Sequence, residues 1–315
     1  MPIVSTSVEH EITVSAPAAA VYDLIADVEN WPLLFEPTIH VEYIEREAET
    51  ERIRIWATAN GAAKTWTSRR TLDPQSLRVD FRQEVPQPPV GGMGGAWVVE
   101  PLSEYESRVR LLHDYFPATE DPADRDWIAK AIDANSGKEL AALKKRAELD
   151  ALSNVSQLLF SFDDTVIVDG PLEDVYDFIN DATLWGERLP HVARVVLEEE
   201  TPGLQILEMD TITTDGSTHT TKSVRVCQLH EKIIYKQIKV PALMTLHTGE
   251  WTFERPPNGA TAVTSRHTVR INEANIAGVL GEHAGVDEAK DYVRSALTAN
   301  SLATLTLAKN YAESR

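Results

Sequence analysis

Apolar and polar residues alternate along much of this chain, in short segments separated by turn signals. In KTWTSRRTL, at residues 64–72, the period of two is typical of a β-strand with one buried face. The dipeptide Asn60-Gly61 precedes this segment and predicts a tight hairpin. Residues 122–149 and 287–312 instead carry apolar residues at helical spacing. The pattern therefore predicts antiparallel strands followed, twice, by a long helix.

An internal repeat explains why the pattern occurs twice. VYDLIADVENW at Val21–Trp31 returns 154 residues later as VYDFINDATLW at Val175–Trp185. A repeat of this length indicates two whole domains rather than solenoid units. We predict an N-terminal domain at residues 1–153 and a C-terminal domain at residues 154–315.

Each half has the same order of elements. A β-segment comes first, and Pro17 or Pro171 then opens a short helix. An antiparallel meander follows, and a long helix closes the half. The predicted fold class is α+β, with a curved antiparallel sheet wrapped around the long helix in each domain. We read the glycine-rich segment VGGMGGAW, at residues 90–97, as a loop and the entry to a strand.

Polar residues are predicted to point inward from two strands of each domain. Alternation places Trp66, Ser68 and Arg70 on one face, and the repeat places Ser223 and Arg225 on the matching face. In the last strand of each domain the same argument turns one histidine inward, His113 in the first copy and His267 in the second. Asparagine is mildly unfavourable within a helix, so Asn135 and Asn300 are expected to reach inward from the long helices. Buried polar groups are costly unless they are paired or face a polar cavity, so we expect a cavity in each domain.

Each of these residues also has a purely structural interpretation. Arg70 and Arg225 could each be paired with a buried carboxylate. His113 and His267 could be hydrogen-bonded core residues, and the tryptophans could be ordinary core residues.

Composition and charge argue against several classes of partner and cofactor. The net charge of −19 and the pI near 4.9 argue against nucleic acid and anionic membranes as partners. Cys227 is the sole cysteine, which excludes an intrachain disulfide, and with no visible secretory signal we expect a cytoplasmic protein. The histidines show no metal-ligand spacing and no dinucleotide or phosphate-binding motif occurs, so we predict neither a metal nor a cofactor.

The motif Trp66-x-Ser68-x-Arg70, with Trp31 upstream and Asn135 in the closing helix, resembles a known family. It is similar to the two-domain polyketide aromatase/cyclases of bacterial type II polyketide pathways, in the Bet v 1-like, START-related helix-grip superfamily. The resemblance covers essentially the whole chain, once per half. It implies two tandem helix-grip domains, each with an internal cavity.

The resemblance also implies an activity. The expected reaction is regiospecific intramolecular aldol cyclisation of a carrier-bound poly-β-ketone, with dehydration that aromatises the first ring. The implied partners are an acyl-carrier-protein-tethered polyketide and other polyketide synthase components. The predicted catalytic residues are Arg70, Ser68, His113, Arg225 and Ser223. The predicted substrate-binding residues are Trp31, Trp66, Phe35, Met93, Asn135, His267 and Asn300.

The two copies differ in one part of the motif. Thr221 stands where the first copy has Trp66, so the second copy lacks that aromatic wall. We therefore expect the N-terminal cavity to be the better equipped for catalysis. The alternative function is a non-catalytic carrier of a hydrophobic small molecule, which would need a mostly apolar lining.

Overall fold

The structure is a computed structural model that describes residues 5–151, 158–212, 216–255 and 259–315. The chain divides into two compact units, Met1–Val155 and Ser156–Arg315. The predicted boundary between residues 153 and 154 lies outside the described residues. No helix in the described ranges is long and apolar enough to cross a membrane.

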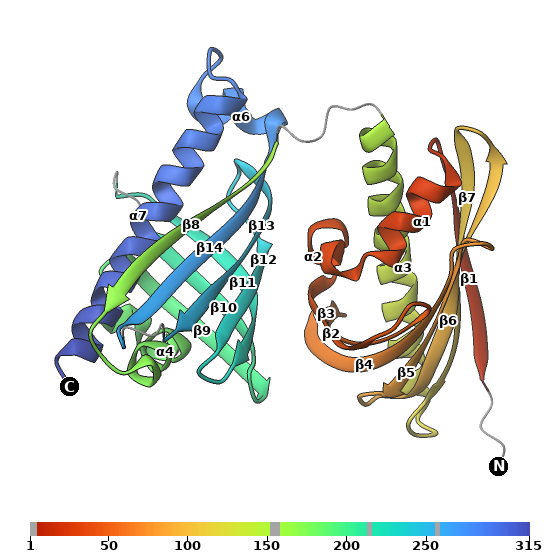
Figure 1. The fold of residues 1–315 in the computed structure, drawn as a ribbon, viewed down its shortest axis with the longest axis horizontal. Coiled ribbons are helices and arrows are strands. Elements are labelled where there is room, and N and C mark those ends of the chain that lie inside the picture. The colour runs from red at the N-terminus through yellow and green to blue at the C-terminus, as the bar shows by residue number, and fades with distance from the viewer. Residues whose placement is uncertain (1–4, 152–157, 213–215, 256–258) are drawn as a thin grey trace. The chain divides into compact units, whose positions relative to one another are not determined.

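The first unit is a seven-stranded antiparallel sheet with the strand order β1-β7-β6-β5-β4-β3-β2. Its long closing helix lies along the curved sheet (Figure 1). The elements are β1 Thr6–Val14, α1 Ala18–Ala26, η1 Val28–Asn30, α2 Trp31–Leu34, β2 Thr38–Arg46, β3 Thr50–Ala59, β4 Ala62–Asp73, β5 Arg78–Val85, β6 Val90–Ser103, β7 Glu106–Pro117 and α3 Pro122–Ala151.

The second unit repeats this topology, with the strand order β8-β14-β13-β12-β11-β10-β9. The elements are β8 Leu159–Val168, α4 Leu172–Asn180, η2 Ala182–Leu184, α5 Trp185–Arg188, β9 Val192–Thr201, β10 Leu204–Ile212, β11 Thr218–Gln228, β12 Lys232–Lys239, β13 Met244–Glu254, β14 Thr261–Ile271, η3 Glu273–Asn275, α6 Ile276–Leu280 and α7 Val286–Glu313. The predicted α+β class and helix-grip architecture are confirmed.

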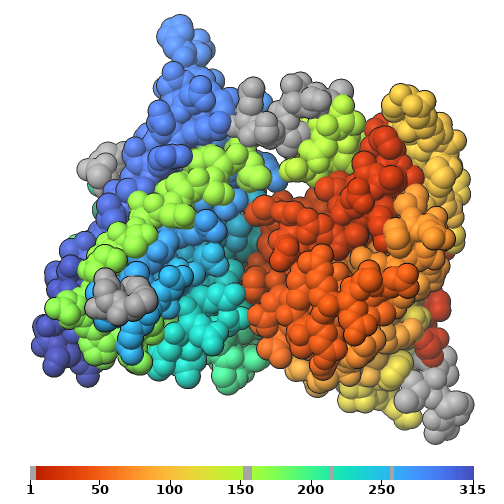
Figure 2. Space-filling model, viewed as in Figure 1, coloured from red at the N-terminus to blue at the C-terminus, as the bar shows by residue number. Residues whose placement is uncertain are grey.

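Local sequence explains where several elements begin and turn. Pro17 and Pro171 are the N-cap residues of α1 and α4, with φ fixed near −60° by the proline ring. Asn60 (φ 49°) and Gly61 (φ 81°) both have the left-handed backbone that a tight hairpin between β3 and β4 requires. The space-filling view shows the side chains of β2 to β4 packed as a continuous layer on the first unit (Figure 2).

The prediction of a loop at VGGMGGAW was wrong, because these residues lie inside β6. The glycines allow close approach within the sheet. A Cβ at Gly95 would lie 1.8 Å from the carbonyl oxygen of Leu112 on β7. Gly249, at the same place in the second unit, would bring a Cβ to 2.3 Å from the carbonyl oxygen of Arg266.

Each long helix packs into the core at its C-terminal end and lines a cavity along the preceding turns. Leu140, Leu143 and Ala147 of α3 are buried in the core with Val21 and Ile25 of α1. A fully buried side chain of this size contributes about 1.5–3 kcal/mol, so this end of the helix anchors it to the sheet. The preceding turns of α3 line a cavity instead. The α7 helix is divided in the same way, with its core residues at Leu305, Ala308 and Ala312.

Candidate active site

One row of side chains crosses five neighbouring strands in each unit, from β3 to β7 and from β10 to β14. In the first unit the row holds Glu51, Arg70, Phe81, Gly95 and His113. In the second unit it holds Gln205, Arg225, Tyr235, Gly249 and His267. The rows differ in two chemical respects: an amide replaces the carboxylate beside the arginine, and a phenol replaces the phenyl ring near the histidine.

The first unit holds two adjoining cavity compartments, of about 880 Å³ and 590 Å³ when their open mouths are included. Ser68, Arg70 and Phe35 line the smaller compartment, while Asn135 lines the larger. Both compartments are lined by Trp31, Ile55, Trp66, Gln83, Met93, His113 and Glu139. The predicted residues of this domain therefore converge on one space.

Arg70 is 1% exposed and strongly held. Its Nη1 donates to Glu51 Oε2 at 2.8 Å and to the carbonyl oxygen of Ala26 at 3.2 Å, and its Nη2 donates to the carbonyl oxygen of Ile25 at 2.9 Å. The guanidinium also lies 5.1 Å from the centre of the Trp31 ring. Burial lowers the pKa of Arg70 and Glu51 opposes this, so the group stays a cation at neutral pH. Three of its five N–H groups donate to described residues, and the other two make no hydrogen bond to them.

His113 and Ser68 supply the neutral polar groups of this cavity. Burial lowers the pKa of His113 to about 4, so its imidazole is neutral at pH 7. Its Nδ1 is buried and has no hydrogen-bond partner among the described residues. The Ser68 hydroxyl donates to the carbonyl oxygen of Arg82 at 3.2 Å. His113 therefore lines both compartments as a neutral imidazole, while Ser68 is already used by the sheet.

Two residues one turn apart on α3 face the cavity. The Asn135 side chain donates to the carbonyl oxygen of Thr58 at 3.1 Å. Glu139 lines both compartments, and burial raises its pKa to about 8. Its carboxyl group is therefore mostly protonated at pH 7 and can donate a proton.

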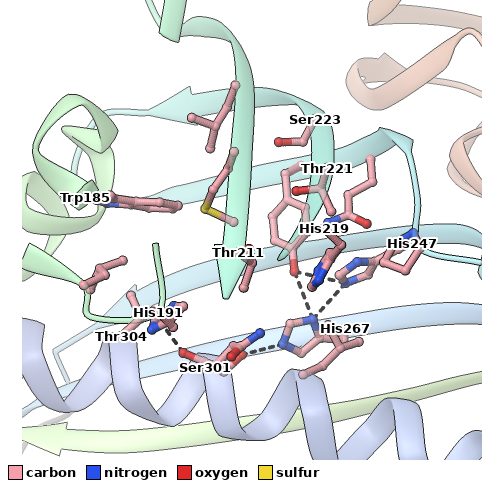
Figure 3. Close-up of a pocket in the computed structure, with 18 of the residues that line it drawn as sticks. Trp185, His191, Thr211, His219, Thr221, Ser223, His247, His267, Ser301 and Thr304 are labelled. Atoms are coloured by element: carbon pink, nitrogen blue, oxygen red, sulfur yellow. Dashed lines mark hydrogen bonds between the residues drawn. The ribbon is translucent and has the colours of Figure 1, made fainter. Parts of the chain in front are cut away.

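The second unit holds one cavity of about 870 Å³ including its mouth. Four of the predicted residues line it: Ser223, Arg225, His267 and Asn300. Thr221, His219 and Trp185 lie on its wall as well (Figure 3).

Arg225 lies in a different electrostatic environment from Arg70. It is 3% exposed, and it donates to the carbonyl oxygens of Ile179 at 2.8 Å and Asn180 at 3.3 Å. Its cross-strand neighbour is Gln205, which donates instead to Glu199 at 2.8 Å. In the part of the chain that the structure describes, no carboxylate lies within 4 Å of Arg225. This cavity thus contains a buried cation without a direct counter-ion.

A hydrogen-bonded cluster fills one wall of the second cavity (Figure 3). His267 Nδ1 lies 2.9 Å from the Tyr235 hydroxyl and 3.0 Å from His247 Nε2. His267 Nε2 lies 2.7 Å from the Ser301 hydroxyl and 3.2 Å from the Ser265 hydroxyl. The first cavity has Phe81 and Met93 where this cluster has Tyr235 and His247.

All twelve predicted site residues line a cavity of their own unit. The structural interpretation also holds in part for Arg70, which is paired with a buried carboxylate. Sequence reasoning missed Glu139, Tyr235 and His247. Glu139 could have been found from its position one turn after Asn135. The sequence spacing of Tyr235 and His247 gives no sign that they belong to a site. In the described ranges, no group of three or more His, Cys, Asp or Glu side chains is placed to hold a metal ion.

Comparisons with known proteins agree with this arrangement. Residues 5–148 and residues 168–289 match two family models, each described as polyketide cyclase/dehydrase and lipid transport. The granaticin polyketide synthase bifunctional cyclase/dehydratase of Streptomyces virginiae is 54% identical, over 94% of this chain and 96% of the relative. The actinorhodin polyketide synthase bifunctional cyclase/dehydratase of Streptomyces coelicolor is 47% identical, over 95% and 94%.

Two solved structures match over both units. The di-domain ARO/CYC BexL from the BE-7585A biosynthetic pathway is 55% identical with a TM-score of 0.85, covering 98% of this chain and 99% of that one. The di-domain ARO/CYC StfQ from the steffimycin biosynthetic pathway is 36% identical with a TM-score of 0.83 and the same coverage. This chain therefore belongs to the polyketide cyclase/dehydrase family and is a two-domain member of it.

Proposed function

We propose that this protein is an aromatase/cyclase that folds a carrier-bound poly-β-ketone, closes its first ring by an intramolecular aldol reaction and dehydrates the product. The observation that carries the proposal is the convergence of Arg70, His113 and Glu139 on one cavity. Full-length relatives that are named bifunctional cyclase/dehydratases support it. A pure carrier is not favoured, because such a protein has no use for these groups together.

Folding the chain into one register is the first contribution of the cavity. A poly-β-ketone has many rotatable bonds, and holding the two reacting carbons together can remove several kcal/mol of entropic barrier. Trp31 and Trp66 wall both compartments and would limit how the chain bends. These rings would thus set which carbons meet.

Carbon–carbon bond formation needs an enolate and a polarised ketone. A methylene between two carbonyl groups is already acidic, so a strong base is unnecessary and the proposal includes no cofactor. The methylene proton would pass to neutral His113 and from there to the aldol alkoxide, which becomes a hydroxyl group, while the two remaining N–H groups of Arg70 would stabilise the enolate and the alkoxide. Glu51 reduces the field of this cation, so Arg70 would act chiefly by directed hydrogen bonds.

Dehydration then needs a base for the α-proton and an acid for the departing hydroxyl. Neutral His113, which lines both compartments, is suited to accept the proton. Protonated Glu139 is suited to donate one to the hydroxyl, which leaves as water. A neutral imidazole and a protonated carboxyl group coexist between pH values of about 4 and about 8.

The proposed partners are the carrier protein and the other polyketide synthase components. An acidic carrier would be repelled on average by a chain of net charge −19, so docking needs local basic residues. In the sequence KKR at Lys144–Arg146, two of the three basic residues are paired with carboxylates. Lys144 lies 3.2 Å from Glu148, and Arg146 lies 2.6 Å from Asp150.

The experiment is product analysis of a reconstituted polyketide synthase supplied with wild type or variants. Arg70→Ala is combined with Glu51→Gln so that no unpaired carboxylate is left buried. The matched control is Arg69→Ala, which removes an arginine from the exposed face of the same strand. We expect shunt products with the double variant alone, and folding is checked by circular dichroism. A folded double variant that gives the wild-type product would overturn the role of Arg70, and Arg225→Ala tests whether the second cavity closes the ring instead.

A further inference from the structure

We propose that the C-terminal cavity is a second catalytic site, in which Tyr235 and the His247–His267 pair transfer the protons of a dehydration. Its substrate class would be a cyclised β-hydroxy ketone, the product of an aldol closure. This inference rests on the proposed function, because that closure supplies the substrate. It assigns roles to Tyr235 and His247, which the motif Ser-x-Arg does not include.

The geometry is that of a proton relay. The imidazole of His267 joins two hydroxyl groups, Tyr235 at 2.9 Å from Nδ1 and Ser301 at 2.7 Å from Nε2. His247 Nε2 lies 3.0 Å from the same Nδ1. Tyr235, His247, His267 and Ser301 all line the cavity, so the relay faces the space where a substrate would lie (Figure 3).

The histidines are held in the state that a relay needs. Burial lowers the pKa of His247 to about 3 and that of His267 to about 4. Each imidazole is therefore neutral near pH 7, with one nitrogen that accepts a proton and one that donates. The other titratable groups on this cavity are His191 and His219, whose pKa values burial also lowers, and Arg225.

The fold makes room for the tyrosine. Tyr235 lies opposite Gly249 on β13, and Gly249 lies opposite His267 on β14. A Cβ at Gly249 would lie 2.6 Å from the Tyr235 hydroxyl oxygen. Tyr235 can therefore cross β13 and reach His267 only because this position is glycine.

The first unit has the same fold without the hydrogen-bonded cluster of the second. It keeps the glycine and the histidine of the row but has Phe81 and Met93 in place of Tyr235 and His247. There His113 Nδ1 is left without a partner among the described residues. The hydroxyl and the second imidazole are therefore not needed to build this sheet, which argues against a purely structural role.

The imidazole of His267, which is hydrogen-bonded to His247, takes the α-proton, and the C–H electron pair forms an enolate beside the cation of Arg225. The enolate electrons then form the C=C bond as the β C–O bond breaks. The departing oxygen takes the proton of Tyr235 and leaves as water. The imidazolium returns its proton to the Tyr235 phenolate along the 2.9 Å hydrogen bond, which restores the site.

The test uses the full-length protein with the reconstituted synthase and mass spectrometry of the products. Tyr235→Phe and His247→Met each install the residue that the first unit has at that position, so both are expected to fold. The matched control is Tyr292→Phe, which removes a hydroxyl from an exposed tyrosine of α7. In a Glu139→Gln background, which removes the proton donor proposed for the first cavity, we expect the ratio of cyclised product that retains the water to dehydrated product to rise at least about tenfold in Tyr235→Phe, since proton transfer by a positioned group contributes about 10²–10⁴. His247→Met should raise the same ratio by a smaller factor.

Two results would overturn the proposal. One is that folded Tyr235→Phe leaves the product ratio of the Glu139→Gln background unchanged. The other, if that variant does not fold, is the same unchanged ratio in folded His247→Met. Failure of the underlying function is a separate outcome, because wild type would then form no more cyclised product than a reaction without this protein.

Discussion

Arg70 Nη1 lies 2.8 Å from Glu51 Oε2, and the two side chains are 1% and 4% exposed. The repeat keeps this arginine but not its counter-ion, since Gln205 lies beside Arg225. One cavity therefore contains an arginine paired with a carboxylate. The other contains an arginine that, among the described residues, has no carboxylate within 4 Å.

Glu51→Gln should lower the free energy of unfolding of the first unit by about 3 kcal/mol, because it leaves Arg70 buried without its partner. Chemical denaturation followed by tryptophan fluorescence measures this, with separate transitions fitted for the two units. Glu84→Gln is the control. This change breaks the ion pairs to Arg52 and Arg69, which are more exposed than the pair between Glu51 and Arg70. It should lower the free energy of unfolding by under about 1 kcal/mol. Equal losses in the two variants would show that the buried pair contributes nothing special.

Glu139 should give dehydration an alkaline limit. Burial raises its pKa to about 8, so the proton donor is present below that pH and is lost as the pH rises through it. We expect the rate of dehydration in the first cavity to fall above pH 8 in wild type. In Glu139→Gln it should be low throughout, because an amide cannot give up a proton. Product formation measured between pH 6 and pH 9 in a Tyr235→Phe background, which removes the proton donor proposed for the second cavity, tests this. An unchanged alkaline limb in Glu139→Gln would assign it to another group.

The same carboxyl group predicts a gain in stability. From pH 4.5 to about 8 the unfolded chain ionises this group while the folded chain keeps it protonated, so stability falls as the pH rises across that window. Glu139→Gln removes this loss and should stabilise the first unit at pH 8 by on the order of 1–3 kcal/mol. Denaturation at pH 5 and pH 8 measures it, and the difference between variant and wild type should shrink at pH 5.

Buried histidines should make the second unit sensitive to acid. Burial lowers the pKa of His247 to about 3, whereas the unfolded side chain takes up a proton below its usual value of 6.5. Stability contributed by this group is present above pH 6.5 and falls as the pH is lowered towards 3. In His247→Met the slope of stability against pH near pH 5 should decrease by up to about 1.4 kcal/mol per pH unit. A slope equal to that of wild type would contradict the neutral state of this imidazole.

Gly249→Ala should damage both the sheet and the relay. The new Cβ would lie 2.3 Å from the carbonyl oxygen of Arg266, so the strands must shift, at a cost of about 1–3 kcal/mol. Gly278→Ala is the control, because nothing lies within 4 Å of its Cβ. In the α6 helix that change should be stabilising by about 0.5–1 kcal/mol. Thermal unfolding separates the two, and equal melting temperatures would contradict the packing argument.

Period-two alternation was enough to place Ser68, Arg70 and His113 on a cavity, because the face of a strand follows from the sequence alone. The ion pair with Glu51 did not follow, since it depends on the register between β3 and β4. Tyr235 and His247 were missed for a related reason. Tyr235 and His247 belong to the site because they contact His267 across neighbouring strands. The repeat gives no hint of this, because the first unit has Phe81 and Met93 at these positions. The glycine run of β6 was misread because its glycines serve close contact between strands rather than a turn.

The row that crosses five strands has an evolutionary consequence. Each position of the row is one residue on one strand. A single substitution there can therefore add or remove a charge or a proton donor in the cavity without changing the register of the strands. Within the row, the two halves differ by a glutamate or a glutamine beside the arginine and by a phenylalanine or a tyrosine near the histidine. Exchanging these two residues would change the charge and the proton donor of a cavity, while Met93 and His247 beside the row would still differ.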